Sequence, residues 1–380
     1  MNESRNTLVL SLVIFSVLAS VGCAVWSEER TPNASERDSA RQQPVVVDGM
    51  RVSYADVVEK TSSAVVQIEA EIPTSSSPNQ FPFVGDEFFK RLFPQGNGGE
   101  PRVQRGAGSG VLVGSDGTIL TNHHVIDGAT KIQVKFQNGE SHEAKIVGSD
   151  APSDLAVLKI EGDDFPFMDL GDSDQVRIGD IVLAIGNPLG IGQTVTAGII
   201  SAKGRRTGIS DGTFEDFLQT DAPINRGNSG GALVNLSGEL IGINSQIISP
   251  SGGSIGIGFA IPSNMAKNVM TQLVDNGKVR RGRLGVMMED VNAEIAKRLG
   301  LSKQIGALVR TVSTPSAASK AGIKEGDVIV AVDGERMESG NALRNKIAAT
   351  LPGTTVKITV IRNGSEVELN ARLEEAVEGR

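Results

Sequence analysis

Short apolar runs of strand length recur between turn signals over most of the first two thirds of the chain. They include "AVVQIEA", "KIQVKF", "LAVLKI", "DIVLAIG", "TVTAGIIS" and "GELIGINSQII". In the second run Ile132, Val134 and Phe136 alternate with polar residues, as the two faces of a half-buried strand require. Many short strands in succession are typical of a β-barrel or a β-sandwich. We therefore expect a β domain that begins near Val52 and runs to about residue 262.

A helix and a second module are expected after these strands. Apolar residues recur at helical spacing between Ser263, which is placed to cap a helix, and Asn276-Gly277, which is placed to stop it. The remaining residues mix strands with short helices, and Asn363-Gly364 between alternating strands is a strong hairpin signal. A chain of 380 residues exceeds what one hydrophobic core normally covers. We expect one domain over residues 52–277 and a second over residues 278–380.

The N-terminal segment contains the longest apolar stretch. Residues 7–26 have no charged side chain and are long enough to cross a bilayer as a helix, which favours an uncleaved anchor over residues 1–26. A lipoprotein signal at Cys23 and an ordinary cleaved signal peptide are the alternatives. Residues 27–51 are polar and fit a flexible tether. All three interpretations place the rest of the chain outside the cytoplasm.

Charge and composition argue against several classes of ligand. The formal net charge of -8 opposes nucleic-acid binding, which draws on clustered Lys and Arg. The glycines of "GAGSGVLVG" lead into a strand, whereas a phosphate-binding loop leads into a helix. His142-Glu143 begins like a zinc-binding helix but lacks the second histidine. We expect no nucleic-acid partner, no cofactor and no metal.

One serine, Ser229, stands among glycines in "INRGNSGGAL". A serine hydroxyl is a poor nucleophile unless a base removes its proton, and its attack on a carbonyl creates an oxyanion that needs hydrogen-bond donors. Gly227 can adopt dihedral angles that turn its N–H inward beside that of Ser229, and we expect Gly230 and Gly231 to leave room for a substrate chain. By itself the motif also fits a strand-linking turn.

A histidine and a carboxylate in two other stretches complete a catalytic set. "ILTNHHVI" places His123 and His124 at the end of an apolar run, and adjacent strand residues face opposite ways, so one of them points inward. Asp154 heads "SDLAVLKI", where a carboxylate needs a partner such as a histidine N–H. Taken alone, His124 also fits a core histidine and Asp154 a strand-end cap. Together the three features favour a Ser-His-Asp mechanism in the chain order of chymotrypsin-type enzymes.

The motifs also carry a family resemblance. "TNHHV", "SDLAVLKI", "GNSGGALVN" and "SGGSIGIGFAIPS", together with the C-terminal module, resemble the HtrA (Deg) serine proteases, bacterial members with one PDZ domain. The resemblance covers nearly everything from residue 52 onward. It implies a mainly β fold, in which a chymotrypsin-like double β-barrel, the trypsin-like serine protease domain, is followed by one α+β PDZ domain. It also implies a homotrimer or a multiple of it.

The same resemblance assigns catalytic roles to individual residues. It makes His124 the base, Asp154 the carboxylate that orients the base, and Ser229 the nucleophile. It places the oxyanion hole at the backbone N–H groups of Gly227 and Ser229, with Asn228 between them. His123 occupies a position that varies among relatives.

Three further sites follow from the resemblance: a substrate pocket, a loop of the PDZ domain that binds peptide C-termini through backbone N–H groups, and a regulatory loop. Their residues are Ser245, Gln246 and Ile247 for the pocket, Arg283, Leu284, Gly285 and Val286 for the PDZ loop "GRLGV", and Arg205 for the regulatory loop. Many relatives carry a small residue where this chain has Gln246, so the size of the pocket stays open.

These features predict an ATP-independent serine endopeptidase in the periplasm or on the extracytoplasmic face of the bacterial inner membrane. It is expected to cleave unfolded or misassembled proteins through an acyl-enzyme and to be regulated by peptide C-termini at the PDZ domain. The alternatives are a membrane-tethered regulatory protease with one or few signalling substrates, and a chaperone or scaffold on a protease-like fold.

Overall fold

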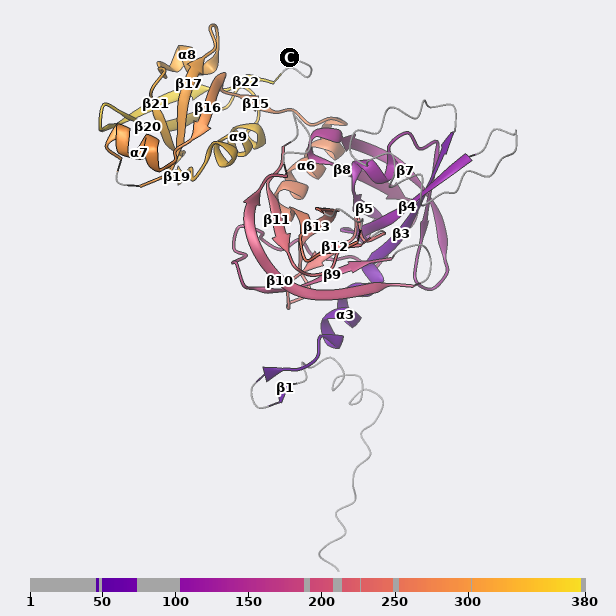
Figure 1. The fold of residues 1–380 in the computed structure, drawn as a ribbon. Helices are drawn as coiled ribbons and strands as arrows, with labels where there is room; N and C mark the ends of the chain where they lie inside the picture. Colours follow the sequence, from indigo (N-terminus) through magenta and orange to yellow (C-terminus); the bar gives the residue numbers. More distant parts are fainter. Residues whose placement is uncertain are drawn as a thin grey trace, which may run out of the picture. The chain divides into compact units, whose positions relative to one another are not determined.

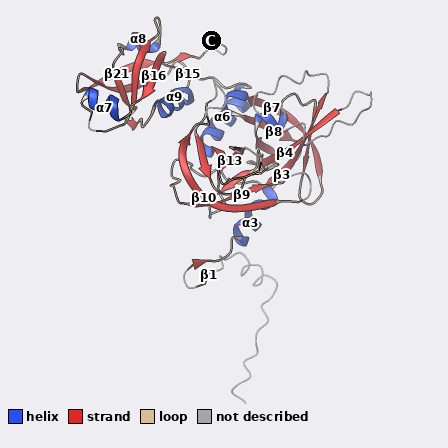
Figure 2. Cartoon of the chain, viewed as in Figure 1, coloured by secondary structure: helices blue, strands red, loops and turns tan. Residues whose placement is uncertain are grey.

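Strands make up most of the regular structure (Figure 2). The computed structural model describes residues 46–47, 50–73, 103–187, 192–207, 214–225, 227–248, 253–301 and 303–376. The chain divides into two compact units between Asp56 and Val57. Within the first unit, β1 (Val46–Val47) pairs in antiparallel fashion with β2 (Met50–Arg51).

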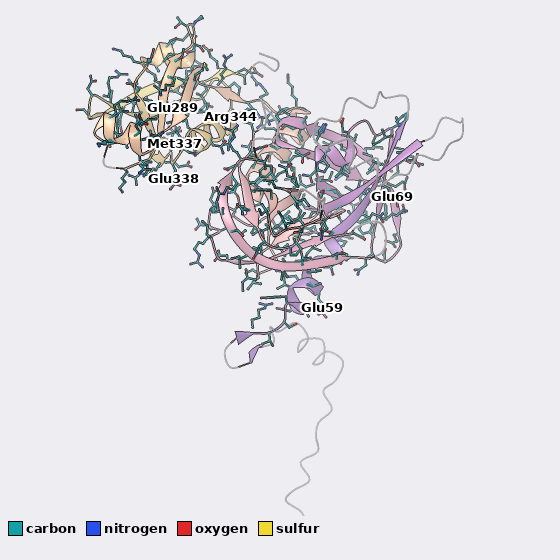
Figure 3. All side chains as sticks on the ribbon, in the orientation of Figure 1. Glu59, Glu69, Glu289, Met337, Glu338 and Arg344 are labelled. Atoms are coloured by element: carbon teal, nitrogen blue, oxygen red, sulfur yellow. The ribbon has the colours of Figure 1, made fainter. Side chains whose placement is uncertain are left out.

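The first barrel follows helix α3 (Ala55–Thr61) and the short 3-10 helix η1 (Ser62–Ala64). It closes in the order β3-β4-β5-β8-β7-β6. Strands β3, β4, β5, β7 and β8 of this barrel are labelled in Figure 1. Its strands are β3 (Val65–Pro73), β4 (Val103–Leu112), β5 (Thr118–Thr121), β6 (Lys131–Lys135), β7 (Ser141–Asp150) and β8 (Leu155–Ile160). The expected alternation holds in β6, where Ile132 and Val134 are buried between polar neighbours. Glu69 of β3, labelled in Figure 3, forms an ion pair with Lys135 of the neighbouring strand β6 at 2.6 Å.

The second barrel closes in the order β10-β11-β14-β13-β12-β9. Its strands are β9 (Ile181–Gly186), β10 (Thr194–Arg205), β11 (Phe217–Thr220), β12 (Ala232–Val234), β13 (Leu240–Ile247) and β14 (Gly258–Pro262). Its interior is filled by buried aliphatic side chains that include Val182, Ile200, Leu218, Leu233 and Ile241. Two closed six-stranded barrels therefore confirm the mainly β, chymotrypsin-like architecture that the sequence predicts.

Helix α6 (Ser263–Asn276) follows the last barrel strand and packs against β13 and β14 of the second barrel and β7 and β8 of the first. It ends at Gly277, as expected, because this glycine takes a left-handed φ of 68° and its N–H bonds the Leu273 carbonyl. The expected cap at Ser263 is wrong. Pro262 occupies the cap position, and the Ser263 hydroxyl donates instead to the Gly171 carbonyl at 2.6 Å. Tertiary contact has thus replaced the local cap.

The C-terminal module is an α+β fold with its own apolar core. One sheet has the order β16-β17-β18-β20-β21, with β19 paired to β18, and β15 pairs with β22. Buried Met337 belongs to the core of this module (Figure 3). The strands are β15 (Gly282–Arg283), β16 (Val286–Asp290), β17 (Ala307–Val312), β18 (Val328–Val332), β19 (Glu335–Arg336), β20 (Thr355–Arg362), β21 (Ser365–Arg372) and β22 (Glu374–Glu375). The helices are α7 (Ala293–Leu299), α8 (Ala317–Ala321) and α9 (Gly340–Ala349).

The hairpin signal at Asn363-Gly364 is confirmed. These two residues join β20 to β21 with φ values of 52° and 79°, the left-handed backbone that a two-residue hairpin turn requires. Within the described ranges, no helix is long and apolar enough to cross a membrane. The expected anchor over residues 1–26 lies outside those ranges.

Candidate active site

The candidate base lies on a single helical turn at the end of β5. Helix α5 (His123–Ile126) follows Asn122, and the buried side chains of Val125 and Ile126 anchor it to the barrel. The sequence interpretation treated His123 and His124 as strand residues, which is wrong, because the chain turns into a helix before them. The two side chains nevertheless have different partners, and one of them is the expected carboxylate. His124 contacts Asp154, whereas His123 lies 3.7 Å from Asp127.

The candidate carboxylate, Asp154, lies between the 3-10 helix η2 (Ala151–Ser153) and the start of β8. Its backbone is left-handed, with a φ of 53°. The Asp154 side chain accepts hydrogen bonds from three donors. Nδ1 of His124 lies 2.9 Å from both carboxylate oxygens, the His124 backbone N–H donates at 3.1 Å, and the Ser245 hydroxyl donates at 2.9 Å. The carboxylate is therefore held from two sides.

The same contacts set the ionisation of the pair. Burial alone raises the pKa of Asp154, but the charge and ring N–H of His124, its backbone N–H and the Ser245 hydroxyl outweigh burial and hold the pKa below its ordinary value. Burial also lowers the pKa of His124, and the charge and hydrogen bond of Asp154 outweigh that effect, so the pKa lies above its ordinary value. An ionised Asp154 thus fixes the proton of the neutral imidazole on Nδ1 and leaves Nε2 as the acceptor.

The candidate nucleophile, Ser229, lies in the turn that precedes β12. Its hydroxyl donates to the Ser245 carbonyl at 2.9 Å. Among the described residues the Ser229 hydroxyl makes no hydrogen bond to His124, so the hydroxyl must leave the Ser245 carbonyl before His124 can accept its proton. Catalytic hydrogen bonds are often unformed before substrate binds. Ser245 contacts both Asp154 and Ser229 and so joins the two parts of the site.

The turn before Ser229 leaves two backbone donors free. Gly227 has a φ of 90°, a left-handed backbone conformation that glycine adopts readily. Over the part of the chain that the structure describes, the N–H groups of Gly227 and Ser229 have no hydrogen-bond partner. The N–H of Asn228, between them, bonds the Asn225 carbonyl at 3.0 Å. Donors that alternate in this way fit an oxyanion hole.

The two glycines after Ser229 have a different use from the expected one. A Cβ on Gly230 would lie 2.1 Å from the Ser109 carbonyl oxygen, and a Cβ on Gly231 would lie 2.2 Å from the Ile185 carbonyl oxygen. Both positions therefore face strands of the barrels. The glycines allow the loop to pack tightly on β4 and β9, and the expectation that they leave room for a substrate chain is wrong.

The three candidate pocket residues lie at the end of β13. Ser245 is buried, and its hydroxyl is used by Asp154. Gln246 donates from Nε2 to the Thr207 hydroxyl at 3.3 Å, and Thr207 bonds the buried carboxylate of Glu215 through its hydroxyl at 2.9 Å. Ile247 is half-buried and packs against the core of the second barrel. The side chain of Gln246 is therefore tied to residues that follow β10.

Two backbone carbonyls of the candidate PDZ loop accept hydrogen bonds from other parts of the C-terminal module. The Leu284 carbonyl accepts from the Ala318 N–H at 2.8 Å, and the Gly285 carbonyl accepts from the Ser313 N–H at 2.9 Å. Gly285 has a φ of 85°, and a Cβ there would lie 2.4 Å from Cβ of Ser316. The remaining candidates differ in exposure. Leu284 is buried, Val286 is half-buried, and Arg283 is exposed.

The candidate regulatory residue, Arg205, is the last residue of β10 and is exposed. Two residues that the sequence reasoning did not assign also contact the site. One is Ser109 of β4, which bonds the turn around Ser229. The second is Thr121 of β5, whose hydroxyl donates to the Ser109 carbonyl at 2.7 Å. The only sequence signal for Ser109 is a polar side chain within the glycine-rich stretch "GAGSG" that leads into an apolar run.

Family models match both halves of the chain. Residues 108–243 match the trypsin-like peptidase domain, and residues 282–373 match the PDZ domain. The periplasmic serine endoprotease DegP of Escherichia coli (strain K12) is 41% identical over 393 residues, which cover 98% of this chain and 80% of DegP. The probable periplasmic serine protease do/HhoA-like of Haemophilus influenzae is 47% identical over 333 residues, which cover 85% of this chain and 71% of that protein.

Solved structures agree with these matches. The HtrA-type protease AlgW with a tripeptide is similar with a TM-score of 0.68 at 42% identity, and the comparison covers 86% of this chain and 98% of AlgW. A serine endoprotease from Yersinia pestis is similar with a TM-score of 0.56 at 38% identity, and the comparison covers 86% of this chain and 100% of the Yersinia chain.

Proposed function

Because this chain belongs to the HtrA family of trypsin-like serine proteases and carries a PDZ domain, we propose that it cleaves unfolded or misassembled proteins through an acyl-enzyme. The chain is a periplasmic serine endopeptidase, with DegP and DegQ among its relatives. One observation supports the catalytic part most strongly: Nδ1 of His124 lies 2.9 Å from the Asp154 carboxylate, and Ser245 joins this pair to Ser229.

In the proposed first step, the Ser229 hydroxyl turns from the Ser245 carbonyl toward Nε2 of His124. His124 takes the hydroxyl proton while Oγ forms a bond to the carbonyl carbon of the substrate, and the electron pair of the C=O bond moves to the oxygen. The N–H groups of Gly227 and Ser229 are placed to bind this oxyanion. Asp154 stays ionised and stabilises the imidazolium.

In the proposed second half, His124 gives its proton to the nitrogen of the leaving amine, and the C–N bond breaks to leave an ester on Ser229. Water then adds to the ester by the same route, with His124 as the base, and the acid product and the free hydroxyl are released. All of these groups belong to the chain or to water, so we expect no cofactor. We place the protease domain at residues 52–277 and the PDZ domain at residues 278–380.

The substrate class can be tested with one protein in two states. A reduced and alkylated small protein should be cleaved without ATP, whereas its native disulfide-bonded form should persist. Ser229→Ala should remove this cleavage, and Ser237→Ala, in an exposed turn after β12, is the matched control that should retain it. Equal cleavage of the native and unfolded forms would contradict a preference for unfolded chains, and cleavage by Ser229→Ala would contradict the assigned nucleophile.

We further propose that the PDZ domain binds the C-termini of peptides and raises protease activity. Strand β16 is at the end of its sheet, so its outer edge is open to an added strand among the described elements. In the described part of the chain the N–H groups of Leu284 and Gly285 have no hydrogen-bond partner, which leaves them available to a terminal carboxylate. The buried side chain of Leu284 makes the base of this loop apolar. These features favour peptides that end in an apolar residue.

A peptide that ends in an apolar residue should therefore raise kcat for a separate reporter substrate by about 5–150-fold, the usual range of allosteric coupling. The same peptide with an amidated C-terminus should have no effect, because the backbone N–H groups lose their carboxylate. Arg205→Ala should reduce the response if the loop after β10 transmits it. Equal activation by the free acid and the amide would contradict recognition of the C-terminus.

A dedicated regulatory protease with one or few substrates is the second candidate, favoured by the apolar segment at residues 7–26. Proteomics of the membrane and periplasmic fractions, with the active enzyme and with Ser229→Ala, separates the two. Many accumulating proteins indicate quality control, and one or few indicate signalling. We propose a homotrimer or a multiple of it, associated with the inner membrane, which light scattering and fractionation can test. A chaperone or scaffold without hydrolysis is excluded if turnover depends on Ser229.

A further inference from the structure

Ser109 bridges the first barrel and the turn that carries the candidate nucleophile. It lies on β4, 118 residues before Gly227, and it is fully buried. Its backbone N–H donates to the Ser229 carbonyl at 2.8 Å, and its hydroxyl donates to the Gly227 carbonyl at 2.5 Å. The hydroxyl oxygen also accepts from the Asn187 N–H at 2.8 Å, and the Ser109 carbonyl accepts from the Thr121 hydroxyl at 2.7 Å. Every polar group of Ser109 is therefore used.

The Ser109 hydroxyl bonds the peptide group that lies between the two free donors, the N–H groups of Gly227 and Ser229. The peptide between Gly227 and Asn228 is held at its carbonyl by Ser109 and at its N–H by the Asn225 carbonyl at 3.0 Å. The next peptide is held at its carbonyl, because Asn228 accepts from the Gly231 N–H at 2.9 Å, and its N–H is the free donor of Ser229. Fixing the first of these peptides fixes the spacing and relative direction of the two donors.

We infer that Ser109 is a positioning residue of the oxyanion hole, because its hydroxyl holds the N–H groups of Gly227 and Ser229 in their relative orientation. A glycine at position 227 gives the turn its φ of 90°, but glycine itself has little preference for one backbone conformation. A contact from outside the turn is needed to hold it, and a hydroxyl supplies one because it can donate to the Gly227 carbonyl while accepting from Asn187. This inference rests on the proposed function, because it assumes that the two free donors bind an oxyanion.

Ser109→Ala removes the bond and leaves the free donors in place but less well held. Loss of a whole oxyanion donor costs about 10²–10³ in kcat, so loss of its alignment should cost about 10–10². KM should stay within about threefold, because the donors act on the transition state and not on the bound substrate. A peptide boronate, whose tetrahedral adduct on Ser229 places an oxygen at the donors, should lose affinity in proportion to kcat/KM.

The matched control is Ser263→Ala. Ser263 is also buried, at 1% exposure, and its hydroxyl also donates to a glycine carbonyl, that of Gly171, but it belongs to the start of α6. This control should keep kcat, KM and the boronate affinity of the wild type. Ser109→Cys is the second variant, because it fills similar space with a weak donor, and its kcat should fall between those of wild type and Ser109→Ala.

Three results would overturn the inference. The first is a kcat of folded Ser109→Ala within about threefold of wild type, and the second is a loss of kcat in Ser263→Ala equal to that in Ser109→Ala. The third applies if Ser109→Ala does not fold, and it is a kcat of Ser109→Cys equal to that of wild type. Folding is checked by circular dichroism and thermal melting. Failure of the proposed function is distinct, because the wild-type protein would then show no turnover that depends on Ser229.

Discussion

Gly230→Ala should be among the most damaging single-methyl changes in the protease domain. Gly230 has a φ of 81°, and a Cβ at this position would lie 2.1 Å from the Ser109 carbonyl oxygen and 2.4 Å from the Thr121 hydroxyl. Real Cβ atoms essentially never come within 3.0 Å of such an atom, so the turn must move by about 1 Å away from β4. That movement carries Ser229 and its free N–H with it.

The expected loss of stability has two parts. A left-handed backbone costs an alanine about 1–2 kcal/mol, and overpacking against backbone costs about 1–3 kcal/mol, so the free energy of unfolding should fall by about 2–5 kcal/mol. A misplacement of about 1 Å at a catalytic group can cost about 10²-fold in rate, so kcat/KM should fall by at least that factor in the folded fraction. Activity should be lost at temperatures where the variant is still folded.

Gly139→Ala is the matched control. Gly139 lies in the turn before β7 with a φ of 89°, and a Cβ there would meet nothing within 4 Å. It should lose only the conformational part, about 1–2 kcal/mol, and none of the activity. Stability is measured by urea unfolding followed by circular dichroism, and activity by peptide hydrolysis. Equal stability and equal activity of the two variants would refute the packing of the turn on β4.

Three other changes test the chemistry. Because the pKa of His124 is raised above its ordinary 6.5 and only the neutral imidazole accepts the serine proton, activity should fall on acidification with a midpoint above pH 6.5, and a profile flat from pH 8 to pH 5 would contradict this. Asp154→Asn should lower kcat by about 10⁴-fold, as the equivalent change does in the serine protease triad. It should also move the acidic midpoint to lower pH, because the charge that raises the pKa of His124 is gone. An unmoved midpoint would assign the titration to another group. Cleavage sites in a denatured protein, mapped by mass spectrometry, should follow small or medium aliphatic residues, because Ile247 offers an apolar wall, and a map of cuts after Lys and Arg would refute this.

Local patterns were sufficient to predict much of the fold. The alternation in β6 is real, and α6 ends at Gly277 as expected. Asn363-Gly364 forms the predicted hairpin. Each of these features depends on the residues of one short segment, through side-chain periodicity or through the left-handed backbone that glycine and asparagine tolerate. For that reason the sequence alone carries them.

The features that the sequence does not reveal are either too short to show a period or depend on contacts between distant segments. Helix α5 is only one turn long, too short for a helical period to be seen, so His124 was read as part of a strand. The packing of Gly230 on Ser109 joins residues more than a hundred positions apart. The bond from the Ser245 hydroxyl to Asp154 joins residues 91 positions apart, and nothing in the neighbours of Ser245 indicates it. Such contacts arise only when the two barrels are packed together.

The central claim is that His124 activates Ser229, and an activity-based label tests it most directly. A fluorophosphonate reacts with the hydroxyl of an activated serine, so mass spectrometry should find the label on the peptide that contains Ser229. Labelling should be lost in Ser229→Ala and should slow by about 10³-fold or more in His124→Ala, because the base is then missing. A label on another serine, or labelling of Ser229 at the wild-type rate in His124→Ala, would contradict the account.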